Sequence, residues 1–464
     1  MRALKRQLAV AVAMASVMLL VGCSHIPSMY APYPQQMKPI RQVTQQGNEG
    51  AAVQALQPAL KSDDWQLYSL ETARLLQLQG DYPSSISLYD RVVGSATQSM
   101  LRGDHQGFFA MFFSGGLYDG SARPYQIPPY ELILAYQNDA FSYLATGNVQ
   151  TSLVVFRQVN ALEDYLDANY LNDINKMNQD FDEDSILHDG PSYQNLIANT
   201  YKPASVSWSI QNGLIDLIAS FVFFNTGDFS TAQQELQRAQ AHSPVAMRQF
   251  MMTKLPDAHA RNSQVWVLLE QGFVPLRQQK NYTFYTSVWV AGHSYNLRAI
   301  FSMPIYVKSM PALGNFSVAA SGVRSDFVPL LNIGDLAAAS LRERYMLYLS
   351  TADMQVASQV SDIRSDVVAL SKTKEDTPQR FDARNQVRYD EYPRVTPADL
   401  RSWSTLPNDI QLAKLELPAG SHAIKVQDKA HVVVAGCSIK VARGKIALVW
   451  VNLQTQQSLC LQLL

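Results

Sequence analysis

The chain has 464 residues, with 38 Lys and Arg against 39 Asp and Glu, and this balance excludes a protein that binds nucleic acid through a strongly basic surface. Hydrophobic residues make up 47% of the chain and charged residues 17%, which excludes global disorder and indicates a sizeable core. The length predicts two or three domains, and the three cysteines are too few for a disulfide scaffold or a cysteine-rich zinc module.

The first 22 residues have the pattern of a lipoprotein signal peptide. Basic residues within positions 2–6 precede an apolar run at 8–20, which is shorter than the about 20 residues that a membrane-spanning helix needs. The run ends in the tetrapeptide LVGC at 20–23, which resembles the bacterial lipobox. In lipoproteins of that type the chain is cut before the cysteine, whose thiol then carries diacylglycerol. We therefore expect lipidation at Cys23, and an ordinary signal peptide that contains a cysteine is the alternative.

Residues 23–50 are predicted to be a flexible tether between the lipid and the folded body. Four prolines and a glutamine-rich, glycine-containing end favour an extended chain. In the sorting rule of enteric bacteria, Asp after the lipidated cysteine retains a lipoprotein at the inner membrane, so Ser24 favours the outer membrane. Removal of residues 1–22 leaves 35 basic and 39 acidic residues, so the mature chain is expected to be mildly acidic.

Residues 51–260 show helical spacing of apolar residues, with a helix–turn–helix pattern that occurs three times. Each copy turns at a glycine: Gly80, Gly147 or Gly227. A small residue lies seven before each glycine and another five after it, and a large apolar or aromatic residue lies nine after it. The residues seven before the three glycines are Ala73, Ala140 and Ser220. Those five after are Ser85, Ser152 and Ala232, and those nine after are Tyr89, Phe156 and Leu236.

The shared offsets resemble the tetratricopeptide repeat, whose helix pairs stack into a groove that holds peptides or partner helices. Generic helical hairpins are the alternative, because 67 and 80 residues separate successive turn glycines. We expect Tyr82, Phe156 and Phe229 to be the large side chains that fill the space between the paired helices.

Two stretches interrupt the helical pattern. Residues 103–120 are rich in Gly and Phe, and predict either an apolar docking loop or a loop buried against the helices. Residues 180–184 are acidic but lack the turn glycine of a calcium-binding loop, so an exposed acidic loop is the better prediction.

Residues 261–464 are predicted to be β-rich, with an inserted helix at 335–371. Short β-branched and aromatic segments precede the helix. Five more follow it, and their spacing predicts a small antiparallel sandwich or barrel. Cys437 and Cys460 lie on neighbouring candidate strands, where they either form a disulfide or remain two buried thiols. The whole chain is therefore predicted to have an α+β fold.

No catalytic motif occurs in the chain. The eight histidines do not form HxH, HxxxH or HExxH arrangements, and neither a nucleophile elbow nor a phosphate-binding glycine loop is present. The sequence consequently predicts no catalytic residue, no metal site and no cofactor.

Four segments together resemble a family of uncharacterised Gram-negative lipoproteins with a repeat-bearing N-terminal half. They are YQIPPYELILAYQNDAFSYLATGNVQTSLVVF (125–156), VWVLLEQGFVPLR (265–277), LNIGDLAAASLRERY (331–345) and DLRSWSTLPNDIQLAKLELPAGSH (399–422). Members of that family are often encoded beside the lipoprotein activator of a bifunctional penicillin-binding protein. Members tend to have a Glu and paired arginines after the middle hairpin, whereas this chain keeps only Arg157 there.

These observations predict a non-catalytic outer-membrane lipoprotein that faces the periplasm and acts as a scaffold or regulator in envelope assembly. The resemblance implies an envelope protein as partner, such as a component of the peptidoglycan synthesis machinery, besides the membrane that holds the lipid. A periplasmic enzyme acting on glycan or peptide, or a carrier of lipid or glycan, is the alternative.

Overall fold

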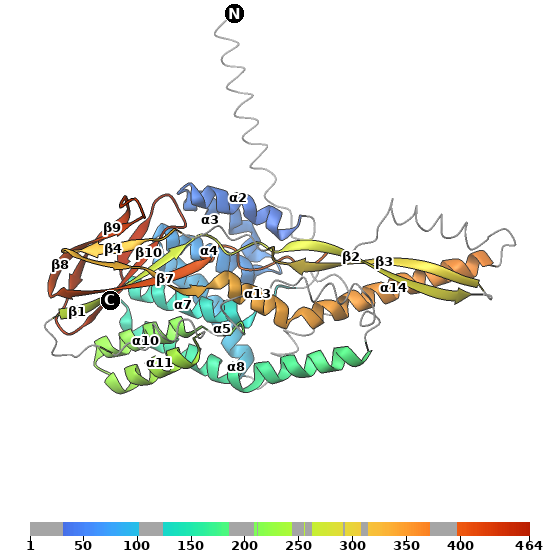
Figure 1. Cartoon of the computed structure of the whole chain (residues 1–464), viewed down its shortest axis with the longest axis horizontal. Helices are drawn as coiled ribbons and strands as arrows, with labels where there is room; N and C mark the ends of the chain where they lie inside the picture. Colours follow the sequence, from blue (N-terminus) through green and yellow to red (C-terminus); the bar gives the residue numbers. More distant parts are fainter. Residues whose placement is uncertain are drawn as a thin grey trace, which may run out of the picture.

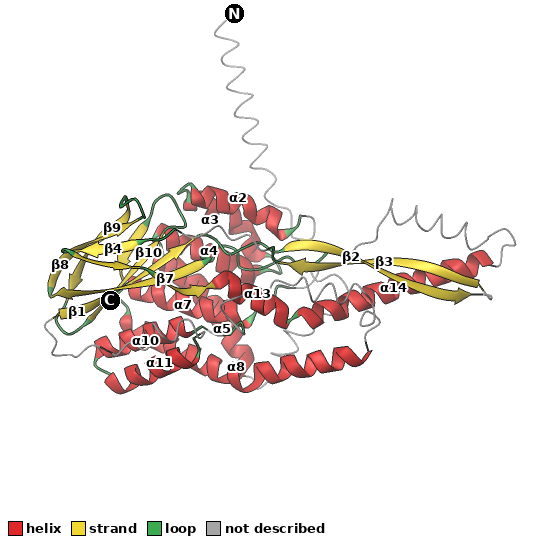
Figure 2. Cartoon of the chain, in the orientation of Figure 1, coloured by secondary structure: helices red, strands yellow, loops and turns green. Residues whose placement is uncertain are grey.

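The computed structural model has the α+β fold that the sequence predicts, with paired helices first and a β-rich region with a long helix after them (Figures 1 and 2). It describes residues 31–101, 124–184, 208–210, 212–243, 255, 262–290, 293–307, 314–371 and 397–464. Within these ranges, no helix is both long enough and apolar enough to cross a membrane. Cys23 and the Gly- and Phe-rich stretch at 103–120 lie outside the described residues.

Three helix pairs stack in chain order. The first helix of each pair is α4 (Trp65–Gln79), α7 (Pro129–Ala145) or α10 (Gly213–Thr226), and the second is α5 (Tyr82–Leu101), α8 (Val149–Asp184) or α11 (Phe229–Ala241). Helix α5 packs on α7, and α8 packs on α10. The three turn glycines have φ values of 86°, 76° and 89°, a left-handed conformation that only glycine adopts without strain. The acidic run 180–184 is the end of α8, so the prediction of a loop there is wrong.

The structure corrects the predicted tether at its C-terminal end. Helices α2 (Tyr33–Gln45) and α3 (Glu49–Leu56), followed by the 3₁₀ helix η1 (Gln57–Lys61), already belong to the folded body. Tyr33 and Met37 are buried in the main core. Proline is tolerated in the first turn of a helix, where Pro34 stands, and the burial of these apolar side chains stabilises α2 in spite of Pro39 in its interior.

Two sheets form a sandwich rather than a barrel. The five-stranded sheet has the order β11-β10-β1-β7-β6, and the four-stranded sheet has the order β5-β4-β8-β9. The strands of the first sheet are β11 (Leu459–Gln462), β10 (Ile446–Asn452), β1 (Asn262–Gln271), β7 (Asp409–Pro418) and β6 (Val328–Asn332). Those of the second are β5 (Val323–Asp326), β4 (Ser317–Ala320), β8 (Gly420–Gln427) and β9 (Val433–Val441). Strands β1 and β10 pair in parallel, so the sandwich is not wholly antiparallel as expected.

The central strands of the five-stranded sheet are buried on both faces. In β1, Trp266 and Leu268 face the helices, whereas Val265, Val267 and Leu269 face the four-stranded sheet. Strands β7 and β10 alternate in the same way, because successive side chains of a strand point to opposite faces. The helical half and the β-rich half therefore share one core across the sequence boundary expected near residue 260.

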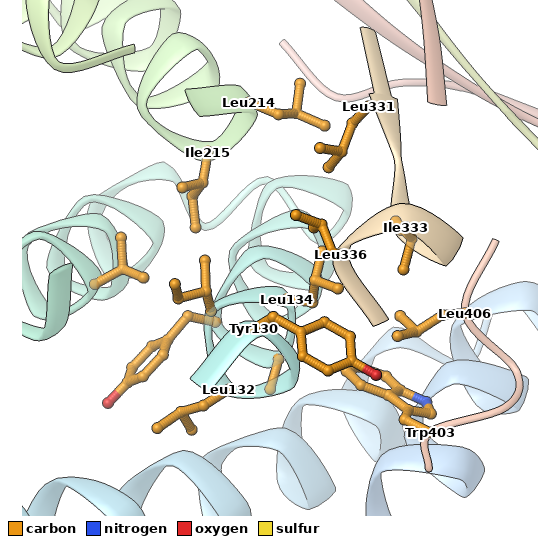
Figure 3. Packing of buried hydrophobic residues seen from close by; sticks show 14 of the residues in the cluster. Tyr130, Leu132, Leu134, Leu214, Ile215, Leu331, Ile333, Leu336, Trp403 and Leu406 are labelled. Atoms are coloured by element: carbon orange, nitrogen blue, oxygen red, sulfur yellow. The ribbon is translucent and has the colours of Figure 1, made fainter. Parts of the chain in front are cut away.

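Figure 3 shows where this shared core lies, with side chains of α7, α10, β6, α13 (Ile333–Glu343) and the segment before β7 packed together. Helix α14 (Tyr345–Ser371) follows α13 after a break at Arg344, so the single helix predicted at 335–371 is two helices. The two-stranded hairpin of β2 (Gln278–Val290) and β3 (His293–Ile305) runs along α14. Together the hairpin and α14 form a projection, which we call the arm (Figure 1).

Candidate functional site

The repeat positions derived from the turn glycines are confirmed. The small residues seven before and five after each glycine are fully buried between the paired helices, and so are Tyr89, Phe156 and Leu236 at the ninth position. Tyr82 and Phe229 pack less deeply than predicted: Tyr82 packs against the main core as a partly buried residue, and the Phe229 ring lies 5.3 Å from that of Phe224 on the paired helix. They begin α5 and α11 at the rim of each pair, where Tyr82 is half-buried and the Phe229 side chain is 51% exposed.

Helices α4 and α7, the first helices of the first two pairs, hold a segment of the same chain. Residues 399–408, which we call the strap, run without regular secondary structure into β7, and positions 401–408 are all buried. The strap lies against two buried carboxylates, Glu71 of α4 and Glu131 of α7. Glu131 Oε1 accepts a hydrogen bond from the backbone N–H of Trp403 at 3.0 Å. Glu71 accepts from the backbone N–H groups of Ser404 and Thr405, at 2.6 and 2.9 Å.

Tyrosine hydroxyls supply further donors to these two carboxylates. Tyr33 donates to Glu71, and Tyr125 and Tyr130 donate to the two oxygens of Glu131 at 2.6 and 2.9 Å. Burial raises the pKa of both carboxyl groups, and the hydrogen bonds limit that rise. The strap therefore meets these carboxylates with three backbone N–H groups, and the side chains of Ser404 and Thr405 also help to lower the pKa of Glu71.

An ion-pair cluster fixes the start of the strap. Arg401 donates to Asp64 of the α4 N-cap at 2.6 Å and to both oxygens of Asp399, at 2.9 and 3.0 Å. Burial opposes ionisation of Asp399, but the guanidinium of Arg401 outweighs it and lowers the pKa of Asp399. The ring of Trp403, which is fully buried, lies 6.0 Å from that of Tyr89. The strap is thereby joined to a repeat position.

A cavity of about 60 Å³ lies beside the strap, between it, α14 and the base of the hairpin. Its charged lining is mainly basic, with Arg277, Arg344 and Arg401 opposed by Asp399. Arg277 is buried and lies 3.3 Å from the hydroxyls of Tyr306 and Tyr348. Cavities for drug-sized ligands measure about 300–1,000 Å³, so this one fits a few waters or a small anion and no glycan.

A second cluster lies between α8, α10 and the end of α11. One ligand atom from each of Glu163, Asp216 and His242 lies within 4.8 Å of the other two. These residues are 53 and 26 positions apart in sequence, so no spacing motif could identify them. The sequence predicts no metal site, and this cluster is the group of described residues whose chemistry fits one.

The arm has one covered edge and one open edge. The side-chain amide of Gln359 on α14 pairs with both backbone groups of Ile300 on β3, at 3.1 and 2.8 Å. Among the described residues no further strand pairs with β2. Tyr285 in the middle of β2 is 73% exposed. Within the described part of the chain, the open edge of β2 therefore offers a partner backbone groups that pair with no other strand, and an exposed aromatic side chain.

Cys437 of β9 and Cys460 of β11 form a disulfide, with their Cα atoms 5.5 Å apart. The bond joins the two sheets of the sandwich, since β9 and β11 belong to different sheets. Of the two alternatives that the sequence leaves open, the disulfide is the one found. A disulfide of this kind is typical of proteins folded outside the cytoplasm.

Comparison with family models, curated proteins and solved structures finds no match to this chain. The four segments that carry the family resemblance nevertheless meet in space. Glu131 binds the strap, the N–H of Val274 donates to the carbonyl of Leu406 at 3.0 Å, and the N–H of Ile333 donates to that of Asn408 at 2.8 Å. Residues of all four segments thus contact one another around the strap.

Proposed function

We propose that the protein is a non-catalytic, lipid-anchored scaffold of the outer membrane, that it faces the periplasm, and that it binds an envelope protein through its arm. The observation that carries the choice of surface is that helices α4 and α7 already bind the strap. In a repeat array the groove between stacked helix pairs is the expected peptide site, and these two helices belong to the first two pairs.

A partner peptide would have to displace the strap in order to bind in the groove. It would need to replace the fully buried Trp403 and Leu406, and three hydrogen bonds to carboxylates, at the same time. Hydrogen bonds to charged groups contribute about 1.5–3 kcal/mol each, and truncation of a buried Trp costs about 3–5 kcal/mol. The strap is therefore part of the core, and the accessible binding surface lies elsewhere.

The arm has the features of such a surface. It projects from the body, and the open edge of β2 can accept a strand from a partner by main-chain hydrogen bonding (Figure 1). The resemblance described above favours a component of the peptidoglycan synthesis machinery as that partner.

In-cell photocrosslinking tests this proposal. A photoreactive phenylalanine derivative replaces Tyr285 in the full-length protein, and the crosslinked species are identified by mass spectrometry. Val432, which is 58% exposed on the sandwich, is the matched control position. We expect a defined adduct with a peptidoglycan-synthesis protein at position 285 and none at 432. Equal crosslinking at both positions, or none at 285, would contradict docking through the arm.

The anchor is tested separately by Cys23→Ala. We expect this variant to appear in the soluble periplasmic fraction, to lose the 285 adduct and to fail to rescue a deletion of the gene. Full rescue by the soluble form would count against an anchored scaffold.

The alternative functions require a different kind of site. A carrier of lipid or glycan needs a large apolar or aromatic-lined cavity, and the cavity beside the strap is small and basic. An enzyme needs perturbed acidic or basic groups that line a cleft. Asp399 and Arg401 line the cavity but are paired with each other, and Glu163, Asp216 and His242 do not line it. Neither alternative is favoured by the described residues.

A further inference from the structure

Three helices bring the Glu163–Asp216–His242 cluster together. Glu163 lies on α8, Asp216 lies in the first turn of α10, and His242 is the C-cap residue of α11. His242 Nδ1 is 2.8 Å from Asp216 Oδ2 and 3.8 Å from Glu163 Oε2. Tetrahedral ligands at 2.0–2.1 Å from a zinc ion stand about 3.3 Å apart, so these distances bracket the geometry of a shared ion.

Two buried carboxylate oxygens face this cluster without a hydrogen-bond donor. Glu163 and Asp216 are 3% and 0% exposed, and neither Glu163 Oε1 nor Asp216 Oδ1 has a hydrogen-bond partner. Arg238 does not satisfy them. It contacts Glu163 through the other oxygen at 3.3 Å, and its Nε is 3.7 Å from Asp216 Oδ1, which is an ion-pair distance without a hydrogen bond. Buried charges of this kind are normally paired or coordinate a metal.

The charges around the cluster leave a surplus of negative charge. The cations that face it are Arg238 and His242, and Arg238 is also paired with Asp164 at 2.7 Å. The acidic groups that face it are Glu163, Asp167, Asp216 and Glu235. Burial, together with the negative charge of Asp216, raises the pKa of Glu163, so an added cation at the cluster is favoured.

The remaining nitrogen of His242 has the partner that metal-bound histidines require. His242 Nε2 lies 3.1 Å from Asp167 Oδ2, and the Asp167 side chain is 52% exposed. In carboxylate–histidine–zinc sites a carboxylate of this kind fixes the orientation and tautomer of the ring. The His242 side chain is itself 16% exposed, so an ion can reach the cluster from the surface.

We propose that Glu163, Asp216 and Nδ1 of His242 bind a divalent transition-metal ion, with zinc as the ion that fits this donor set best. Water completes the coordination, and Asp167 orients the histidine. Metal ligands bind in their deprotonated forms, so binding is expected to strengthen as the pH rises. The ion would join α8 to the third helix pair, which makes it a structural site.

Calorimetric titration of the purified, chelator-treated full-length protein with Zn²⁺ tests the proposal. We expect saturable uptake of one ion per chain, with an affinity that rises with pH because metal ligands bind in their deprotonated forms. This measurement uses the wild-type chain and does not depend on any variant.

Variants then locate the ion. His242→Gln and Asp216→Asn should each weaken binding by more than about a hundredfold, and Asp167→Asn by about 10–100-fold. Asp164→Asn is the matched control, because Asp164 is 68% exposed and pairs only with Arg238 on the outer side, so its effect should stay below about fivefold. Circular dichroism checks that each variant is folded. Absence of saturable uptake at pH 8, or uptake unchanged in both ligand variants, would overturn the proposal.

Discussion

Buried carboxyl groups in this protein differ in what surrounds them. Glu71 and Glu131 accept hydrogen bonds from backbone and tyrosine donors, so their burial is compensated. Asp139 of α7 is equally buried, yet neither of its oxygens has a hydrogen-bond donor among the described residues. Burial, together with the nearby carboxylate of Asp90, raises the pKa of Asp139 from 3.8 to about 8. This residue therefore destabilises the fold near and above neutral pH.

We expect Asp139→Asn to stabilise the protein. The folded-state pKa is raised, so stability is complete below pH 3.8 and is lost progressively as the pH rises through about 8. Asn keeps the shape of the side chain without the ionisation. Urea unfolding should give a gain of about 1–3 kcal/mol at pH 8 and little or no gain at pH 4. A gain of equal size at both pH values would show that ionisation of Asp139 is not the cause.

The strap is the element that decides which surface is available to a partner. It has no regular secondary structure, and it is held by its backbone N–H groups and by the side chains of Arg401, Trp403 and Leu406. An irregular segment can be buried only when its polar backbone groups find partners, and Glu71 and Glu131 supply these. The two carboxylates and the strap are thus one structural unit.

We expect Trp403→Ala to destabilise the protein by about 3–5 kcal/mol, because it removes a fully buried ring that contacts Tyr89. The loss of stability is measured by thermal unfolding and compared with that of the control variant Phe229→Ala. Phe229 is an aromatic residue of the repeat region that is 51% exposed, so its substitution should cost much less. Similar losses in the two variants would mean that the strap is not part of the core.

The helix pairs could be predicted from sequence because their signals are local. The turn glycines and the offsets of the small residues act within one pair, so Ala73 and Ser85 could be assigned to an interface without knowledge of the rest of the fold. The strap could not be predicted in this way, since Glu71 and Thr405 are 334 residues apart. The parallel pairing of β1 with β10 is equally non-local. The sequence predicts a tether where helix α2 forms, because its prolines disfavour a helix locally. Tertiary packing of its apolar residues, which is not visible in the sequence, overrides this local preference.

At the scale of the whole molecule, the five-stranded sheet is the middle layer. One face packs on the helices and the other on the four-stranded sheet, so both cores depend on β1, β7 and β10. The buried ion pair between Arg74 of α4 and Glu270 of β1 crosses the first of these contacts. Loss of one partner of a buried ion pair costs about 3–5 kcal/mol, which ties the helices and the sheet together energetically. The described part of the chain should therefore unfold as one cooperative unit.

The disulfide tests this cooperativity, because it acts only on the outer sandwich. Cys437 and Cys460 are 23 residues apart, and a loop of that size contributes about 2–4 kcal/mol. We expect the double variant Cys437→Ser/Cys460→Ser to lose that amount in urea unfolding. Helical circular dichroism and tryptophan fluorescence should shift together, since Trp450 of β10 lies in the core shared with the helices. Reduced wild-type protein should behave like the variant. If the fluorescence transition moved while the helical signal stayed in place, the sandwich would be an independent domain.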